Sequence, residues 1–249
     1  MNDSFAPLRL RADPLHAILF DFYDTLGTRA QGAAAIEIEA LRSFGYEYSA
    51  GAIAEASRRA WAPFDGALDH SAHSASAEQY LAWRSEIDRV WLTELGIDPC
   101  PEDVLTRVSA ASDDPGAYRL FDDVPGALTE LRRRGYGLGV VSNWGWELPA
   151  IFEHAGLAGA LDLLITSARC GYRKPHPEIY RCALRQLALA PSQVLFVGDN
   201  PEADIAGPAA AGMRALLIDR TEVQNGGVGC VANLEVLLGL LPEQAGEPQ

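Results

Sequence analysis

His16-Ala-Ile-Leu-Phe-Asp-Phe-Tyr-Asp-Thr-Leu26 is the stretch of sequence that decides the fold. Its apolar run, Ala17–Phe20, is followed directly by the carboxylate of Asp21. Continuous apolar character is typical of a strand that is covered on both faces, as in a parallel sheet. Reactive groups of α/β proteins gather at the carboxyl ends of such strands. The stretch therefore predicts a buried strand that presents Asp21 as a candidate nucleophile.

Four further apolar runs, each bounded by glycine, proline or polar residues, predict four more buried strands, at residues 138–141, 161–166, 194–197 and 215–218. Helical stretches lie between these runs, at residues 125–134 and Pro177–Leu187. Strands that alternate with helices predict an α/β fold with a doubly wound, Rossmann-like parallel sheet. Because Ser142, Lys174 and Asp199 lie at or just past predicted strand ends, we expect them to meet Asp21 at one edge of the sheet.

Residues 30–115 interrupt this alternation. Apolar residues at helical spacing predict helices throughout, at residues 33–44, 50–60, 77–95 and 102–111. We therefore expect an α/β core made of residues 1–29 and 116–249, and an inserted α-helical cap domain of residues 30–115. The aromatic residues of the insert should pack mainly in its own interior, with one or two facing the substrate.

Composition and charge limit the possible partners. A net charge of −14 repels nucleic acid and anionic membrane surfaces, so neither is expected as a partner. No apolar run approaches the roughly 20 residues of a membrane span, and the first residues lack the apolar segment of a signal peptide. Four cysteines without metal-binding spacing fit a reducing compartment. We expect a cytoplasmic protein, monomer or homodimer, whose small-molecule substrate is anionic and needs local positive charge.

Three later segments complete a pattern that begins at Asp21. They are Val140-Val-Ser-Asn143, Gly171-Tyr-Arg-Lys-Pro175 and Val194-Leu-Phe-Val-Gly-Asp-Asn-Pro-Glu-Ala-Asp204. The four segments, in this order, resemble the motifs of the haloacid dehalogenase superfamily of hydrolases, over residues 16 to about 220. The resemblance implies a helical cap that is inserted between the first and second motifs and covers the active site. It also implies that Asp21 is the nucleophile and forms a covalent intermediate.

The carboxylates of Asp21, Asp199 and Asp204 predict an oxygen-rich cluster that suits a hard, hydrated cation. Magnesium (Mg²⁺) is the expected cofactor, because it prefers few carboxylates, retained waters and phosphate oxygens. The resemblance implies that the ion takes Asp21, the main-chain carbonyl of Tyr23 and Asp199, with Asp204 acting through water. Asp204 has one alternative role, as the cap of the helix that follows it.

Lys174 lies in a loop that resembles the third motif, GxxKPxPxxY. A compact ammonium near Asp21 would keep that carboxylate ionised and neutralise the charge of the transferring group. Ser142 and Asn143 can donate hydrogen bonds to substrate oxygens, although they could simply end a strand. We therefore predict Asp21, Tyr23 and Lys174 as catalytic residues, and Ser142, Asn143 and Lys174 as substrate-binding residues.

Tyr23 departs from the phosphatase pattern, in which a second acid stands two residues after the nucleophile. That acid protonates the leaving oxygen and then activates water, a role that tyrosine fills poorly because its ordinary pKa is about 10. Haloacid dehalogenases carry tyrosine here, since a halide leaves without a proton, but they need no metal and have uncharged residues where Asp199 stands.

The balance between these features favours a magnesium-dependent phosphatase that acts on a small phosphorylated metabolite through an aspartyl-phosphate intermediate. Asp199 decides in favour of the phosphatase, because a third acid would repel Asp21 unless a cation is bound. Two alternatives stay open. One is a metal-independent 2-haloacid dehalogenase, in which Asp21 displaces halide from carbon, and the other is a catalytically weak binding protein that keeps the fold.

Overall fold

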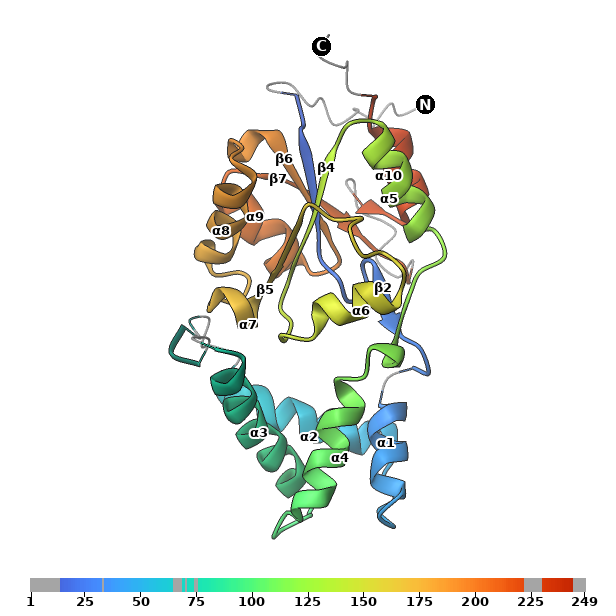
Figure 1. The fold of residues 1–249 in the computed structure, drawn as a ribbon, viewed down its shortest axis with the longest axis vertical. Coiled ribbons are helices and arrows are strands. Elements are labelled where there is room, and N and C mark those ends of the chain that lie inside the picture. The colour runs from blue at the N-terminus through green and yellow to red at the C-terminus, as the bar shows by residue number, and fades with distance from the viewer. Residues whose placement is uncertain are drawn as a thin grey trace, which may run out of the picture.

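The structure is a computed structural model that describes residues 14–32, 34–64, 69, 71–73, 76–221 and 230–243. The amino-terminal segment used in the export argument lies outside the described residues. A parallel sheet with helices on both faces forms one part of the molecule, and four helices gather beyond one edge of that sheet (Figure 1). Within the described residues, no helix has both the length and the apolar character needed to cross a membrane.

Six parallel strands form the main sheet, in the order β5-β4-β1-β6-β7-β8. Their bounds are β1 Ala17–Phe20, β4 Gly137–Ser142, β5 Leu163–Thr166, β6 Val194–Gly198, β7 Arg214–Ile218 and β8 Cys230–Val231. The five predicted strands are therefore confirmed, and the two-residue strand β8 was not predicted. β1 lies at the centre of the sheet, between β4 and β6. Asp21 therefore lies in the middle of the row of strand carboxyl ends, which is called the sheet edge below.

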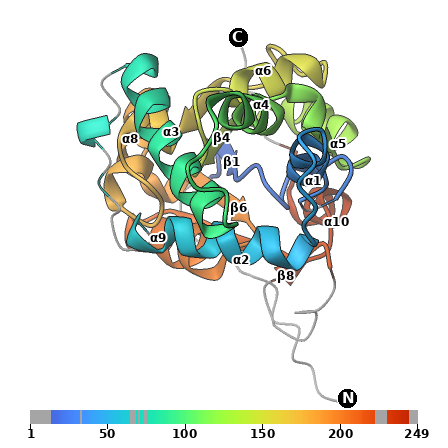
Figure 2. The ribbon, with the colours of Figure 1, turned by 90° about the horizontal axis from the view of Figure 1, so that it is seen from below.

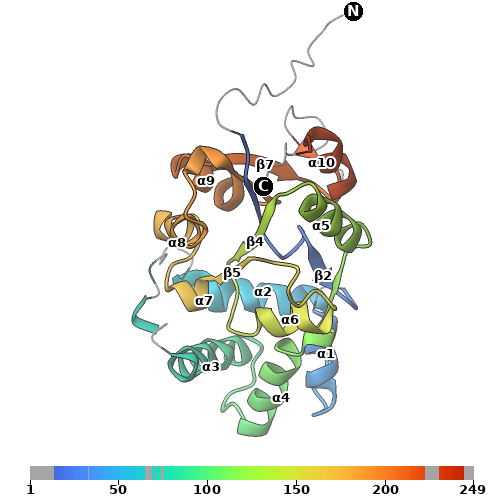
Figure 3. The same ribbon diagram turned by 45° about the horizontal axis from the view of Figure 1, so that its top comes forward.

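Helices cover both faces of the sheet, as the continuous apolar strands predict. One face packs against α5 (Val124–Arg133) and α10 (Leu234–Leu240), and the other packs against α8 (Pro177–Leu187) and α9 (Gly207–Ala210) (Figures 1 and 3). Ile18 and Phe20 join the first of these cores, whereas Ala17 and Leu19 join the second. Neighbouring residues of a strand point to opposite faces, so a strand buried on both sides must be apolar at every position.

Shorter elements complete the core. They are α6 Leu148–His154, α7 Ser167–Cys170, the 3₁₀ turns η3 Pro115–Ala117 and η4 Pro191–Gln193, and the π-helix η5 Pro201–Ala206. A separate two-stranded antiparallel sheet pairs β2 (Gly27–Arg29) with β3 (Tyr118–Leu120) where the chain leaves and re-enters the core. A side chain at Gly27 would meet the Arg119 carbonyl and the Phe22 ring at 2.9 Å, so this pairing requires glycine.

The helical insert contains α1 Ala35–Arg42, α2 Ala50–Trp61, α3 Ala77–Glu94 and α4 Glu102–Ser112, with the 3₁₀ turns η1 Ala62–Phe64 and η2 Ser71–His73. The side chains of Ser49 and Ser76 cap α2 and α3 by accepting hydrogen bonds from backbone N–H groups in the first turn. These helices share a hydrophobic core of their own and cover the sheet edge where β1, β4 and β6 end (Figure 2). The predicted helices are therefore confirmed, while the domain boundaries at residues 30 and 115 stay a prediction.

Candidate active site

Asp21 follows β1 directly and is only 7% exposed. Its backbone N–H donates to the carbonyl of Val197 at 2.9 Å, which fixes it against the end of β6. A tight loop follows, in which the N–H groups of Thr25, Leu26 and Gly27 all donate to the carbonyl of Phe22. This loop turns the chain away from the sheet and leaves the Asp21 side chain at the edge, as the sequence predicted.

Asp199 and Asp204 come from the segment after β6. Asn200 caps the π-helix Pro201–Ala206 by accepting hydrogen bonds from the N–H groups of Glu202 and Ala203. Asp204 lies inside this π-helix, so its alternative role as a helix cap is wrong. Its side chain packs over Gly198, where any larger residue would collide with it.

Lys174, the only lysine in the sequence, is 4% exposed. Its ammonium donates to Asp21 Oδ1 at 2.7 Å and to Asp204 Oδ1 at 2.6 Å. Burial alone would lower the pKa of this ammonium, but the carboxylates of Asp21 and Asp204 outweigh burial and hold the pKa above its ordinary value. Lys174 is therefore a fixed positive charge beside the candidate nucleophile.

Asn143 holds the Lys174 loop against the end of β4. Its amide nitrogen donates to the Lys174 carbonyl at 2.9 Å, and its amide oxygen accepts from the Lys174 N–H at 2.7 Å. The side-chain amide of Asn143 thus positions the backbone of Lys174. Ser142 is buried at the last position of β4. Substrate binding by either residue stays a prediction.

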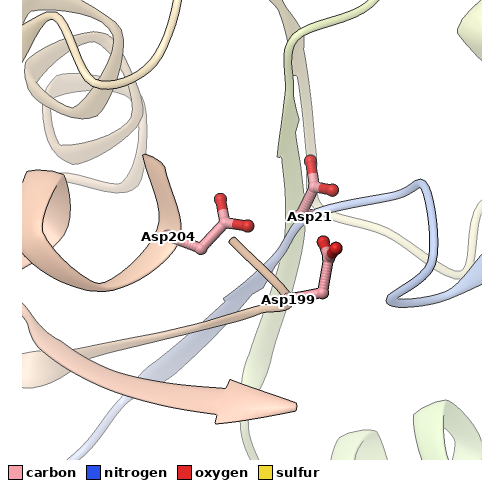
Figure 4. A group of neighbouring side chains, drawn as sticks. All are labelled: Asp21, Asp199 and Asp204. Carbon is pink, nitrogen blue, oxygen red and sulfur yellow. The ribbon is translucent and has the colours of Figure 1, made fainter. Parts of the chain in front are cut away.

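Asp21, Asp199 and Asp204 converge at this edge, each offering an oxygen within 4.8 Å of the others (Figure 4). The Lys174 ammonium donates a hydrogen bond to Oδ1 of Asp204, and the Asn200 N–H donates to Oδ2 at 3.0 Å. Asp21 keeps a second oxygen, Oδ2, without a hydrogen bond to any described residue. Both oxygens of Asp204 are therefore satisfied by the protein, and the division of metal ligands among Asp21, Asp199 and Asp204 stays a prediction.

Asp199 carries the charge that Lys174 does not neutralise. Burial raises its pKa to about 7, and the carboxylates of Asp21 and Asp204 add to this increase. The hydroxyl of Thr25 is the described group that contacts it, at 3.4 Å. A hard divalent cation beside Asp199 would remove this cost, because it favours the ionised carboxylate. The donor set therefore suits a divalent metal ion, as the sequence predicted.

Tyr23 is half-buried, and its ring stacks on Trp144 with centroids 6.0 Å apart. Burial and the neighbouring carboxylate of Asp24 raise the pKa of the phenol above its ordinary value, so the hydroxyl stays protonated at neutral pH. The ring also packs against the hydrophobic core of the sheet. The prediction that the Tyr23 carbonyl binds metal has no test in this geometry and stays a prediction.

Two supporting residues were not singled out from the sequence. The Tyr180 hydroxyl donates to the carbonyl of Ala203 and so supports the π-helix that carries Asp204. Tyr180 is the last residue of the GxxKPxPxxY segment, so the motif itself held this signal. Arg220 donates to the carbonyl of Thr25 at 2.7 Å and pairs with Asp123 at 2.9 Å, and nothing in the sequence links these distant segments.

A cavity of about 460 Å³ lies between the helices of the insert and the loops that follow β4 and β5. Arg29, Glu37, Trp91, Asn143, Trp144 and Arg173 are among the residues that line it. Asp21 does not line the cavity itself. Asn143 and Trp144 connect the cavity to the surroundings of Asp21, since Asn143 binds the Lys174 backbone and Trp144 stacks on Tyr23.

The chain belongs to the haloacid dehalogenase-like hydrolases, because the sequence profile of that family matches residues 15–212. Phosphoserine phosphatase of Thermus thermophilus is 33% identical over 171 residues, which cover 64% of this chain and 68% of the relative. Ribulose-1,5-bisphosphate 5-phosphatase of Halopiger xanaduensis is 30% identical over 217 residues, which cover 83% of this chain and 85% of the relative. The protein is therefore a hydrolase of this family with phosphatase relatives.

A solved structure of L-2-haloacid dehalogenase from Xanthobacter autotrophicus also has this fold. It superposes with a TM-score of 0.69 at 21% identity, over 91% of this chain and 98% of the dehalogenase. The predicted superfamily, fold class and enzyme class are thus confirmed. The fold by itself does not choose between a phosphatase and a dehalogenase, since the choice depends on the chemistry of the site.

Proposed function

We propose that the protein is a magnesium-dependent phosphatase that hydrolyses a small phosphorylated metabolite through an aspartyl phosphate on Asp21. One observation carries the proposal. Asp199 stands beside Asp21 and Asp204 with a pKa raised to about 7, and Lys174 neutralises the other two carboxylates but not this one. A metal-independent dehalogenase has no use for this third acid, whereas a phosphatase uses it to hold a cation.

Asp21 carries the covalent step. The Lys174 ammonium donates to Asp21 Oδ1, which leaves Oδ2 to attack phosphorus. The bond from Asp21 to phosphorus forms as the bond to the ester oxygen breaks, and the leaving oxygen takes a proton from water. Water then attacks the acyl phosphate, releases inorganic phosphate and restores Asp21.

The remaining residues support this step. Asp21 and Asp199 would hold the metal directly, and Asp204 would reach it through water while fixing Lys174. When bound, magnesium supplies positive charge to the phosphoryl oxygens. The Lys174 ammonium adds a second, permanent charge on the same side. The two charges match the substrate, whose phosphate must enter a protein of net charge −14.

Tyr23 restricts the leaving group. A protonated phenol with a raised pKa is a weak acid, so it contributes little proton transfer to a departing alkoxide. The enzyme should therefore hydrolyse aryl and acyl phosphates, whose leaving groups need little protonation, faster than alkyl phosphates. Tyr23 is also the one observation that favours the second candidate, a 2-haloacid dehalogenase.

The discriminating experiment compares both reactions in one preparation. We expect magnesium-dependent phosphate release from p-nitrophenyl phosphate and from members of a panel of phosphorylated metabolites, with no halide release from 2-chloropropionate. The Asp21→Asn variant, purified in parallel, controls for contaminating phosphatases. Halide release without metal would replace the proposal with the dehalogenase, and the absence of both reactions would leave a binding protein.

A further inference from the structure

Two of the four cysteines are in contact beside the loop that carries Lys174, residues 171–176, which is called the Lys174 loop below. Cys170 is the last residue of α7 and directly precedes this loop, and Cys182 lies in the second turn of α8, which follows it. Their Sγ atoms are 3.3 Å apart. Both residues pack against the core beneath α8 but stay only half-buried, so each keeps part of its surface in contact with solvent.

This contact distinguishes the pair from the other two cysteines. The sulfurs of Cys100 and Cys230 each contact the carbonyl of the residue that follows them in the chain. The two sulfurs of a disulfide are about 2 Å apart, so Cys170 and Cys182 need to approach each other by only about 1.3 Å to form one. The fold therefore brings together two thiols that the sequence separates.

The charges around the two sulfurs are unequal. Arg185, on the next turn of α8, donates through Nη2 to the sulfur of Cys182 at 3.1 Å. The charge of the Cys182 sulfur in turn raises the pKa of the Arg185 guanidinium above its ordinary value. A thiolate is the form of cysteine that reacts with oxidants, and a neighbouring guanidinium stabilises it. By contrast, burial raises the pKa of the Cys170 thiol to about 12, and the sulfur of Cys182 adds to this increase.

We propose that Cys170 and Cys182 form a reversible redox site, in which a peroxide converts the two thiols to a disulfide that restricts opening of the Lys174 loop. The Cys182 thiolate attacks one peroxide oxygen, the O–O bond breaks, and the second oxygen leaves as hydroxide and takes up a proton to become water. Cys182 is then a sulfenic acid. The Cys170 sulfur attacks it, the S–S bond forms as the S–O bond breaks, and the oxygen leaves as water with the Cys170 proton.

The order of these two steps follows from the surroundings of the sulfurs. Cys182 reacts first, because Arg185 stabilises its thiolate. Oxidation of Cys182 then removes the negative charge beside Cys170, which is one of the causes that hold the proton on Cys170. Two electrons pass from the sulfurs to the peroxide, and two equivalents of a thiol restore both cysteines.

The crosslink would tie the two helices that flank the Lys174 loop. Asn143 already holds the Lys174 backbone against the end of β4 through two hydrogen bonds, at 2.9 and 2.7 Å. A disulfide would add a covalent connection at the base of the same loop, and it would remove open conformations from the set that the chain can adopt. This inference does not depend on which reaction Asp21 performs.

Peptide mapping tests whether the disulfide forms. The full chain is reduced, treated with hydrogen peroxide, alkylated and digested with trypsin in the absence of reductant. We expect residues 170–173 joined to residues 182–185, with the other two cysteines alkylated, and four alkylated cysteines after treatment with dithiothreitol. Peroxide treatment that yields no linked peptide, or equal linkage to the other two cysteines, would overturn the proposal.

Serine variants test the order of the steps. Peroxide should leave a sulfenic acid on Cys182 in Cys170→Ser, which dimedone traps, whereas Cys170 should stay a thiol in Cys182→Ser. Arg185→Met should slow the oxidation of Cys182 about two- to fivefold, the effect of losing an exposed charge pair. Arg181→Met, in an exposed ion pair with Glu178 on the same helix, is the matched control and should keep the rate of the parent. Equal trapping of both cysteines would contradict the assignment of Cys182 as the reacting sulfur.

Hydrogen exchange tests the effect on the Lys174 loop. In the oxidised parent, exchange of the backbone amides in residues 171–181 should slow about tenfold relative to the reduced parent, because the crosslink suppresses local opening. The thermal midpoint should rise by about 5 °C. Cys170→Ser treated with the same peroxide is the control, and it should show neither change. Formation of the disulfide with unchanged exchange in this segment would overturn the proposed restriction of the loop.

Discussion

The sheet edge and the cavity wall lie next to each other but differ in how their polar groups are satisfied. At the sheet edge, the Lys174 ammonium donates hydrogen bonds to Asp21 and Asp204, at 2.7 and 2.6 Å. The Asn143 side chain holds the backbone of Lys174. At the cavity wall, Arg29 pairs with Glu37 at 2.8 Å, but Arg29 Nη1 and Glu37 Oε2 are buried and have no hydrogen-bond partner among the described residues. In the first region the protein's own groups satisfy Asp21 Oδ1 and both oxygens of Asp204, and the charge of Asp199 is the part that Lys174 does not neutralise. The second leaves buried polar atoms unpaired within the described residues, so the two regions differ in how far the protein itself satisfies its polar groups.

The largest expected effect follows from removing the nucleophile at the sheet edge. Asp21→Asn should reduce kcat at least about 1000-fold for every substrate, equivalent to about 4 kcal/mol of barrier. The fold should persist, because the change is nearly isosteric and Asp204 still holds Lys174. Steady-state kinetics and thermal unfolding are measured on the same sample. Retained turnover within about tenfold would show that the chemistry lies elsewhere.

Lys174→Met should have the largest effect on stability. The variant leaves the Asp21 and Asp204 carboxylates buried without their shared cation. Breaking a buried pair in this way costs about 3–5 kcal/mol of unfolding free energy. Urea titration gives the loss, with Arg133→Met at an exposed ion pair as the control. A loss below about 1 kcal/mol would mean that the buried carboxylates of Asp21 and Asp204 do not depend on Lys174 for their stability.

Tyr23→Asp tests the border between the two regions. An acid at this position can protonate the leaving oxygen, so alkyl-phosphate turnover should rise, with general acid catalysis typically contributing about 10²–10⁴-fold. Aryl-phosphate turnover should change much less, which makes the ratio of the two rates the informative measurement. Equal rates for alkyl and aryl esters in the parent, with chemistry rate-limiting, would require another group to supply the proton.

The last prediction concerns the dependence of stability on pH through Asp199. Burial raises the pKa of Asp199 to about 7 in the metal-free protein, whereas aspartate in the unfolded chain titrates near 3.9. Between about pH 4 and 7 the folded state therefore binds the extra proton, so its stability should fall as pH rises through that window. Asp199→Asn should flatten this slope, and magnesium should stabilise the parent but not the variant. Thermal midpoints across the window provide the test, and equal slopes in both proteins would contradict it.

The residues at the carboxyl ends of the strands could be predicted from the sequence, because parallel strands all end at the same side of a sheet. Continuous apolar runs predicted β1, β4, β5, β6 and β7, and residues just past their ends include Asp21 and Asp199. The β2–β3 pairing escaped prediction, because its strands are three residues long and lie on either side of the insert. Arg29 and Glu37 escaped for a related reason. Their contact depends on how α1 packs against β2, which spacing along the chain does not reveal.

The central claim is that Asp21 carries the phosphoryl group, and trapping this species tests it most directly. The protein is mixed with a limiting amount of an aryl phosphate and magnesium, quenched in acid within one turnover, digested and examined by mass spectrometry. We predict phosphate on the peptide that contains Asp21, with its loss on hydroxylamine treatment and its absence in Asp21→Asn. Turnover of the ester with no phosphate on Asp21, or with phosphate on another residue, would contradict the account.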